Sequence, residues 1–323
     1  MPPSHGPRSL RAIADARTFS EDKLSALRLA LAAVAPAEAC VVTCGSYSRR
    51  EASPSSDIDY FIILPGALDG GPKATQPWQD DVAATIEEIV PLAPSSGGAF
   101  ARIEHADDMV RNIGGESDSN SKITRRMLML LEGEWLTNES RLRRVRRSIL
   151  ERYIGEHIGD HQLALFLLND LIRYYRTMMV DYEFKTMEGS KPKPWGLRNI
   201  KLVFSRKLLY ASGLFSVAMT ADRNRERKIA RLEELFDMPV IDRIVHICGD
   251  TRSERLRESY AHFLDRISQP EIRTALEALP RERRDDDLFR DLKNEGHNFT
   301  REIMKVFELT FDSTHPIRRA VLF

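Results

Sequence analysis

The sequence contains few cysteines, no long apolar run and no excess of charge of either sign. Its 323 residues include only three cysteines, Cys40, Cys44 and Cys248, an odd number that cannot all be paired in disulfides within one chain. This usage is typical of a reducing compartment and excludes a small scaffold held together by disulfides. We therefore expect buried free thiols and a cytoplasmic protein.

Long apolar segments are absent as well. The longest, over 208–221, is shorter than the roughly 20 residues that a membrane-spanning helix needs. The first residues, Met-Pro-Pro-Ser-His-Gly, lack the basic-then-apolar order of a signal peptide. The sequence therefore predicts a soluble protein without a membrane partner.

Lysine plus arginine and aspartate plus glutamate both number 48, so the formal net charge is zero. A protein that coats nucleic acid through a general basic surface would carry a positive excess, which this chain lacks. The length is sufficient for two domains, each with its own core.

The spacing of apolar residues and the positions of glycine and proline predict a series of elements before residue 138. We expect helices over 21–35, 78–90 and 123–135 and strands over 39–43, 58–64 and 99–104.

After residue 138 the pattern is almost wholly helical, with long segments over 162–183, 197–219, 225–235 and 253–267. We therefore expect an α/β fold, or α+β in a stricter scheme. Residues 1–20 form a tail or short helix, 21–138 a small mixed sheet flanked by helices, and 139–323 an all-helical domain.

The most informative stretch runs from Gly45 to Leu64. Gly45 and Ser46 follow a predicted strand, and a glycine turn can present backbone amides to an anion. Asp57 and Asp59 alternate at the next predicted strand, so their carboxylates share one face of the sheet. Neighbouring carboxylates repel each other unless a cation lies between them, and Mg²⁺ is commonly held by one or two carboxylates plus substrate phosphates. The pattern predicts a phosphate site beside a metal site.

This stretch resembles the nucleotidyltransferase superfamily typified by DNA polymerase β. It is most similar to the small bacterial type, whose pattern is Gly-Ser-x-Ala-Arg-Gly-Glu-Ala followed by Ser-Asp-Ile-Asp. Ser48 and Arg50 depart from the Ala and Gly of that pattern. The matching positions are Gly45, Ser46, Arg49, Glu51, Ala52, Ser56, Asp57, Ile58 and Asp59.

The resemblance implies an enzyme that moves a nucleoside monophosphate from an NTP or dNTP, ATP among them, to an acceptor hydroxyl and releases pyrophosphate. It implies that Asp57 and Asp59 are catalytic and bind Mg²⁺, with two ions expected and Mn²⁺ as the alternative metal. Gly45, Ser46 and Arg49 would form the nucleotide-binding turn.

The same resemblance implies a third metal-binding acid on a later strand. Glu104, at the end of the predicted strand over 99–104, is our candidate for this catalytic and metal-binding role. Asp107 and Asp108 are the alternatives, because the end of the strand is not fixed by the sequence.

Basic residues on the predicted helices of the C-terminal half form a further group of candidates. This half is weakly similar to the helical domain of signal-protein uridylyltransferases. Arginine–lysine clusters that face an NTP commonly hold triphosphate oxygens. We therefore expect Lys201 and Arg206 to bind the nucleotide, which would lie in a cleft between the domains; a charged, solvated helix face is the alternative.

Several features stay open at this point. The candidates for the acceptor hydroxyl are a protein, an RNA or DNA end, a small molecule and another nucleotide, and neither the base nor the sugar can be read from the sequence. A partner protein and a homo-oligomer are both open. The alternative function is a nucleotide-sensing or antitoxin-like binding protein with a degenerate site, although the intact Asp57 and Asp59 favour the enzyme.

Overall fold

The computed structural model describes residues 8–66, 76–92, 103–187 and 195–322, and the chain divides into two compact units. The sheet unit consists of Ala16–Gly159 and Asn224–Pro239, and the helical unit of Met1–Asp15, Asp160–Arg223 and Val240–Phe323. This division differs from the boundary that we expected near residue 138, because two helices beyond that residue belong to the sheet unit. The domain limits 1–20, 21–138 and 139–323 stay a prediction.

A four-stranded mixed sheet lies at the centre of the sheet unit, in the order β3-β2-β1-β4. β1 pairs antiparallel with β2 and with β4, whereas β2 pairs parallel with β3. The strands are β1 (Cys40–Cys44), β2 (Asp59–Leu64), β3 (Ile103–His105) and β4 (Glu134–Trp135). The expected fold class, a mixed sheet followed by a mostly helical region, is confirmed.

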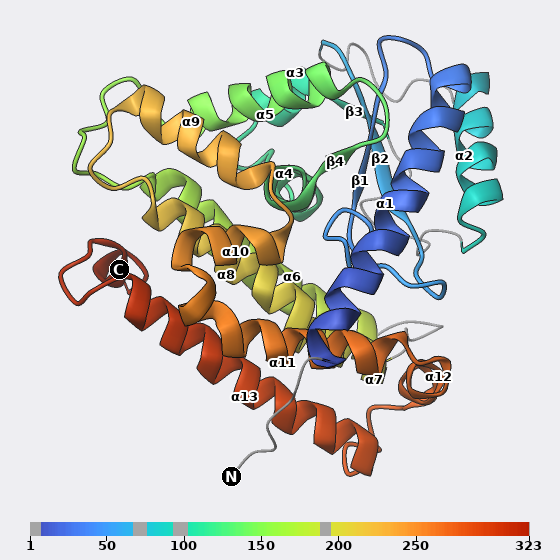
Figure 1. The fold of residues 1–323 in the computed structure, drawn as a ribbon. Helices are drawn as coiled ribbons and strands as arrows, with labels where there is room; N and C mark the ends of the chain where they lie inside the picture. The colour runs from blue at the N-terminus through green and yellow to red at the C-terminus, as the bar shows by residue number, and fades with distance from the viewer. Residues whose placement is uncertain (1–7, 67–75, 93–102, 188–194, 323) are drawn as a thin grey trace. The chain divides into compact units, whose positions relative to one another are not determined.

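Helices cover both faces of this sheet (Figure 1). One face packs against α1 (Arg8–Val34) and α2 (Pro77–Ile89), whose apolar side chains recur at helical spacing. The core on this face includes Leu24, Leu27, Leu31, Val41, Tyr60, Ile62, Val82 and Ile86. The other face packs against α4 (Asn120–Glu132) and α5 (Glu139–Tyr153), which both contact β1. Because side chains alternate along a strand, Asp59 and Phe61 face the α4 side.

The end of α4 corrects one expected element. The helix that we expected over 123–135 ends at Glu132, and the next residues turn back and pair with β1 as β4. Gly133 makes this reversal possible, since a Cβ there would lie 2.5 Å from the Met129 carbonyl oxygen. The sheet unit is completed by α3 (Ala106–Arg111) and by α9 (Arg225–Phe236), which packs on α5.

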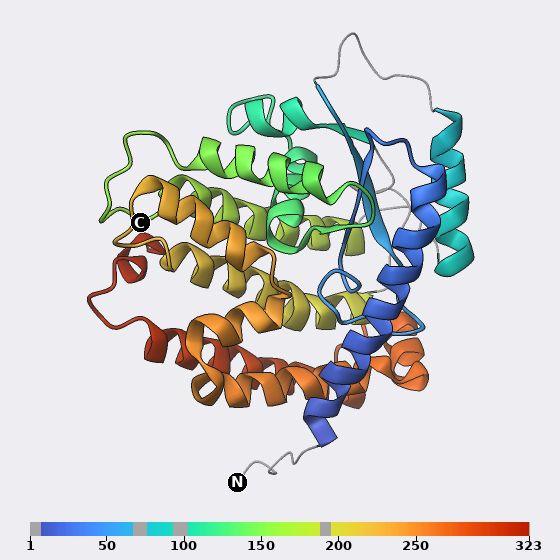
Figure 2. The same ribbon diagram turned by 45° about the horizontal axis from the view of Figure 1, so that its top comes forward.

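The helical unit contains no strand within its described residues. Its elements are α6 (Leu165–Met187), α7 (Trp195–Lys201), the π-helical segment η1 (Leu202–Arg206), α8 (Lys207–Ala218), α10 (Val240–Cys248), α11 (Asp250–Ser268), α12 (Pro270–Ala278), α13 (Asp287–Thr310) and α14 (Ile317–Ala320). α11 packs along α13, as Figure 2 shows.

Aromatic rings fill the centre of the helical unit. Phe204 stacks on Phe263 with 4.4 Å between ring centroids, and Phe299 lies 5.1 Å from Phe204.

Among the described residues, no helix combines the length and the apolar character that crossing a membrane requires.

Candidate functional site

Gly45 begins the turn that follows β1. Its φ of 80° lies in the left-handed region, which a glycine adopts without steric cost. A Cβ at this position would lie 3.2 Å from Oδ2 of Asp59. Glycine therefore allows the Asp59 carboxylate to lie directly against the backbone of the turn.

The turn after Gly45 coils like the first turn of a helix. Three backbone N–H groups donate back to its beginning: Arg49 to Gly45 O (3.1 Å), Arg50 to Tyr47 O (3.1 Å) and Glu51 to Ser46 O (2.8 Å). The amides of Ser46, Tyr47 and Ser48 donate to no acceptor in the part of the chain that the structure describes. Such amides carry partial positive charge and can bind an anion.

Asp57 and Asp59 lie beside this turn. Asp59 begins β2, Asp57 precedes the strand by two residues, and both are partly buried next to the buried Ile58 and Tyr60. Asp59 pairs with Cys44 in the ladder between β1 and β2, which places it next to the Gly45 turn. Burial raises the pKa of Tyr47 to about 12, and the negative charge of Asp57 acts in the same direction. The structure thus brings the turn and both aspartates together.

Arg49 and Glu132 form a buried ion pair that braces the Gly45 turn. Arg49 Nη1 lies 2.6 Å from Glu132 Oε2, and Arg49 Nε lies 2.8 Å from Glu51 Oε2. The other oxygen of Glu132 accepts the Gly45 N–H at 3.1 Å. Because Arg49 is buried between these carboxylates, its guanidinium holds the turn in place. Its expected contact with a nucleotide stays a prediction.

Glu132 was not among the sequence-predicted site residues. It follows a run of apolar residues at the end of a predicted core helix, and a carboxylate in such a place needs a buried partner. That requirement was the only available signal, because the partner, Arg49, is 83 positions away in the chain.

Arg50 occupies the position where the family pattern has glycine. Its φ of 61° lies in the left-handed region, where a non-glycine side chain is strained. The side chain compensates by pairing with Glu21 of α1 at 2.7 Å and with Glu134 of β4 at 2.6 Å. Arg50 therefore links α1 and β4 through its two ion pairs.

Glu104 does not join Asp57 and Asp59. It pairs with Ile63 in the parallel ladder between β2 and β3, and so lies on the face of Asp59 but four residues farther along, about 13 Å at strand spacing. Its carboxylate forms an ion pair with Arg125 of α4. Burial raises the pKa of Glu104, and the positive charge of Arg125 opposes this shift.

The alternatives to Glu104 lie still farther along the chain. Asp107 and Asp108 are in α3, after the end of β3, and Asp107 pairs with Arg111 at 3.1 Å. The segment 91–102, which leads into β3, contains no acid at all. Among the described residues, no group of three metal-ligating side chains is arranged to hold a metal ion. Asp57 and Asp59 therefore remain the two candidate metal ligands, while Glu132, beside the same turn, is held by Arg49.

Lys201 and Arg206 lie in the helical unit. Lys201 ends α7, Arg206 ends the π-helical segment, and both side chains are partly buried. A π-helical turn inside a helix often marks a functional position. Their expected contact with a nucleotide stays a prediction.

Residues 11–91 match the model of the family described as "Putative nucleotidyltransferase DUF294". The match includes β1, the Gly45 turn and both aspartates. A search of curated proteins finds no match. The N-terminal part of the chain is thus similar to a nucleotidyltransferase family, in agreement with the type of protein that the sequence predicts.

Proposed function

We propose that the chain is a metal-dependent nucleotidyltransferase, which moves a nucleoside monophosphate from an NTP or dNTP to an acceptor hydroxyl and releases pyrophosphate. The contact between the Gly45 turn and Asp59 carries this proposal. Backbone amides that can donate to an anion lie beside the Asp59 carboxylate, and such a neighbourhood supports binding of a triphosphate with its divalent cation. The family match over the same residues supports it.

Asp57 and Asp59 fit a hard divalent cation. The two carboxylates are two residues apart and partly buried, and two carboxylates completed by phosphate oxygens are a normal ligand set for Mg²⁺. Mn²⁺, which also prefers oxygen ligands, is the alternative. A metal bound there would neutralise charge on the phosphates and on the departing oxygen. A second ion stays part of the proposal.

The chain's own groups bind and orient the phosphates. The amides of Ser46, Tyr47 and Ser48 donate to phosphate oxygens, and the Ser46 hydroxyl adds a further donor. The brace between Arg49 and Glu132 fixes these donors before the substrate arrives, so little reorganisation is needed during the reaction. We also propose that Lys201 and Arg206 hold triphosphate oxygens.

Mass spectrometry after incubation with mixed NTPs and dNTPs and Mg²⁺ tests the proposal and identifies the acceptor. We expect a nucleotide adduct on the protein, on an added acceptor or on another nucleotide, and no adduct with the Asp57→Asn/Asp59→Asn variant. Unchanged nucleotides with every acceptor class would contradict the proposal.

One observation favours a second candidate, a nucleotide-sensing or antitoxin-like binding protein. Glu104 is paired with Arg125, and the nearby Glu132 is held by Arg49, so that among the described residues no group of three metal-ligating side chains is arranged to hold a metal ion. A two-carboxylate site can hold a metal–nucleotide complex without turning it over. Mg²⁺-dependent binding of a nucleotide without release of pyrophosphate, for all NTPs and dNTPs, would identify this function.

A further inference from the structure

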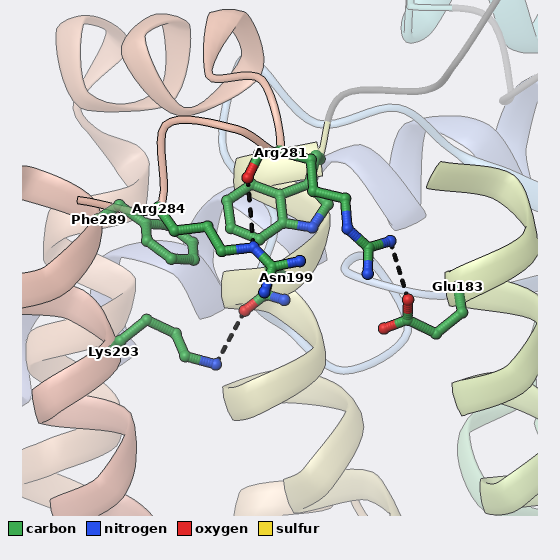
Figure 3. Close-up of a pocket in the computed structure, with 7 residues that line it drawn as sticks. Glu183, Asn199, Arg281, Arg284, Phe289 and Lys293 are labelled. Atoms are coloured by element: carbon green, nitrogen blue, oxygen red, sulfur yellow. Dashed lines mark hydrogen bonds and ion pairs between the residues drawn. The ribbon is translucent and has the colours of Figure 1, made fainter. Parts of the chain in front are cut away.

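A cavity of about 210 Å³ lies within the helical unit. It is formed by α6, α7, the start of α13 and the turn that precedes α13, and Figure 3 shows most of its side chains pointing toward a common space. The residues that line it are Glu183, Trp195, Asn199, Arg281, Arg284, Phe289 and Lys293. Three cationic side chains thus face one anionic side chain.

Two aromatic rings form an apolar wall of the cavity. Trp195 and Phe289 lie 4.6 Å apart between ring centroids, and both are buried. The guanidinium of Arg284 lies 5.7 Å from the centre of the Trp195 ring, within the range of a cation–π interaction. A flat or aliphatic group therefore finds apolar surface next to positive charge.

Lys293 carries a partly buried charge that no carboxylate balances. Its ammonium donates to the Asn199 side-chain oxygen at 2.9 Å, and that of the nearby Lys207 donates to the Thr300 hydroxyl at 2.7 Å. Both acceptors are neutral, and neither lysine has an ion-pair partner among the described residues. Burial lowers the pKa of both lysines, and the charge of Lys293 lowers the pKa of Lys207 further. An anion in the cavity would offset this repulsion.

The one acidic side chain that lines the cavity, Glu183, forms a largely exposed ion pair with Arg281. Glu183 Oε2 lies 2.9 Å from Arg281 Nη1, but the Glu183 side chain is 53% exposed. Exposed ion pairs contribute little free energy because water screens them. Arg281 can therefore exchange Glu183 for a stronger anionic partner.

We propose that this cavity binds a phosphate or diphosphate group, either free or carried by a small organic molecule. Arg281, Arg284 and Lys293 donate to the phosphoryl oxygens, and the pair of Trp195 and Phe289 packs against the organic part where there is one. The volume is below the roughly 300 Å³ at which sites for larger ligands begin, so the ligand is small. The proposal is independent of the function assigned to the sheet unit.

Calorimetric titration of the full chain with inorganic pyrophosphate tests this site. EDTA in a phosphate-free buffer removes metal-dependent binding at Asp57 and Asp59. We expect saturable binding that Lys293→Met weakens at least about tenfold, because the ammonium is lost from the cavity. Lys305→Met, an exposed lysine of the same helix, should leave the affinity unchanged.

Further variants keep the result interpretable. Arg284 is exposed, so Arg284→Ala should fold normally and also weaken binding, whatever Lys293→Met does to stability. Titration with inorganic phosphate and with AMP separates a free anion from a phosphorylated organic ligand; tighter binding of AMP would favour the latter. The proposal is overturned by the absence of saturable binding at millimolar pyrophosphate. It is equally overturned if Gly45→Ala, rather than the cavity variants, weakens binding.

Discussion

At the scale of single residues, Gly45 sets the distance between the anion-binding turn and the carboxylate of Asp59. Its positive φ and the 3.2 Å that would separate a Cβ at this position from Asp59 Oδ2 are two separate constraints. The first concerns the backbone and the second the neighbouring side chain. Comparing an alanine at Gly45 with an alanine at another glycine of positive φ separates the cost of the backbone conformation from the cost of the contact with Asp59.

Gly45→Ala should therefore affect both stability and nucleotide binding. The left-handed conformation costs an alanine about 1 kcal/mol of folding free energy. The new methyl group also displaces the Asp59 carboxylate, so we expect nucleotide affinity in the presence of Mg²⁺ to fall at least about tenfold. Chemical denaturation and calorimetric titration measure the two effects.

Gly114→Ala is the control for this prediction. Gly114 has a φ of 78°, but a Cβ there would have no neighbour within 4 Å. It should lose a similar free energy of folding and keep the affinity for nucleotide. Equal losses of affinity in the two variants would show that the contact with Asp59 is unimportant.

Cys248 predicts a pH dependence of stability. Burial raises the pKa of its thiol from 9.0 to about 11, so the folded protein keeps the proton where the unfolded chain loses it. The contribution is complete below pH 9 and is lost as the pH rises from 9 to 11. The free energy of unfolding should fall by up to about 1.4 kcal/mol per pH unit from this group.

Denaturation curves at about pH 8 to 11 measure this slope. Since other groups titrate in the same range, Cys248→Ala serves as the reference and should show a shallower decline above pH 9. Identical slopes for the two proteins would contradict the assignment. Cys40, whose thiol pKa is raised by burial to about 12, should behave in the same way.

At the scale of elements, α4 supports the candidate site through its last residue. The ion pair of Arg49 and Glu132 is almost fully buried, with 6% and 0% of the side chains exposed. Glu132→Gln leaves a buried guanidinium with one carboxylate fewer, and we expect a loss of about 3 kcal/mol in the free energy of unfolding. Urea denaturation measures it.

Glu139→Gln is the comparison for Glu132→Gln. Glu139 pairs with Arg143 one turn along α5, but the side chains are 41% and 56% exposed. Exposed pairs of this kind contribute less than about 1 kcal/mol. If both variants lose the same free energy, the brace below the Gly45 turn has no special role.

Elements with a strong local pattern were predictable from the sequence. β1 and β2 lie within one residue of their expected limits, because apolar runs bounded by a glycine turn and by polar residues determine them locally. The end of α4 was not predictable, because Gly133 allows a chain reversal that the helical spacing of the apolar residues does not indicate. The place of Glu104 was also not predictable, since it depends on the register between two strands.

At the scale of the whole chain, the sequence identified the mixed sheet, the helical C-terminal half and the cluster of Gly45, Asp57 and Asp59. It did not reveal the composition of the two compact units. In the structure, α5 and α9 belong with the sheet, and this depends on packing between segments that are far apart in sequence. Ion pairs between residues far apart in the sequence, such as that of Arg49 and Glu132, cannot be predicted from local sequence patterns for the same reason.

Release of pyrophosphate is the measurement that tests the central claim most directly. The full chain is incubated with each NTP and dNTP and Mg²⁺, in parallel with Asp57→Asn/Asp59→Asn, which preserves side-chain volume. We expect release with at least one nucleotide and a rate at least about 100-fold lower in the variant, because charge stabilisation of the phosphates is lost. Equal rates for the two proteins, with both shown to be folded, would contradict the account.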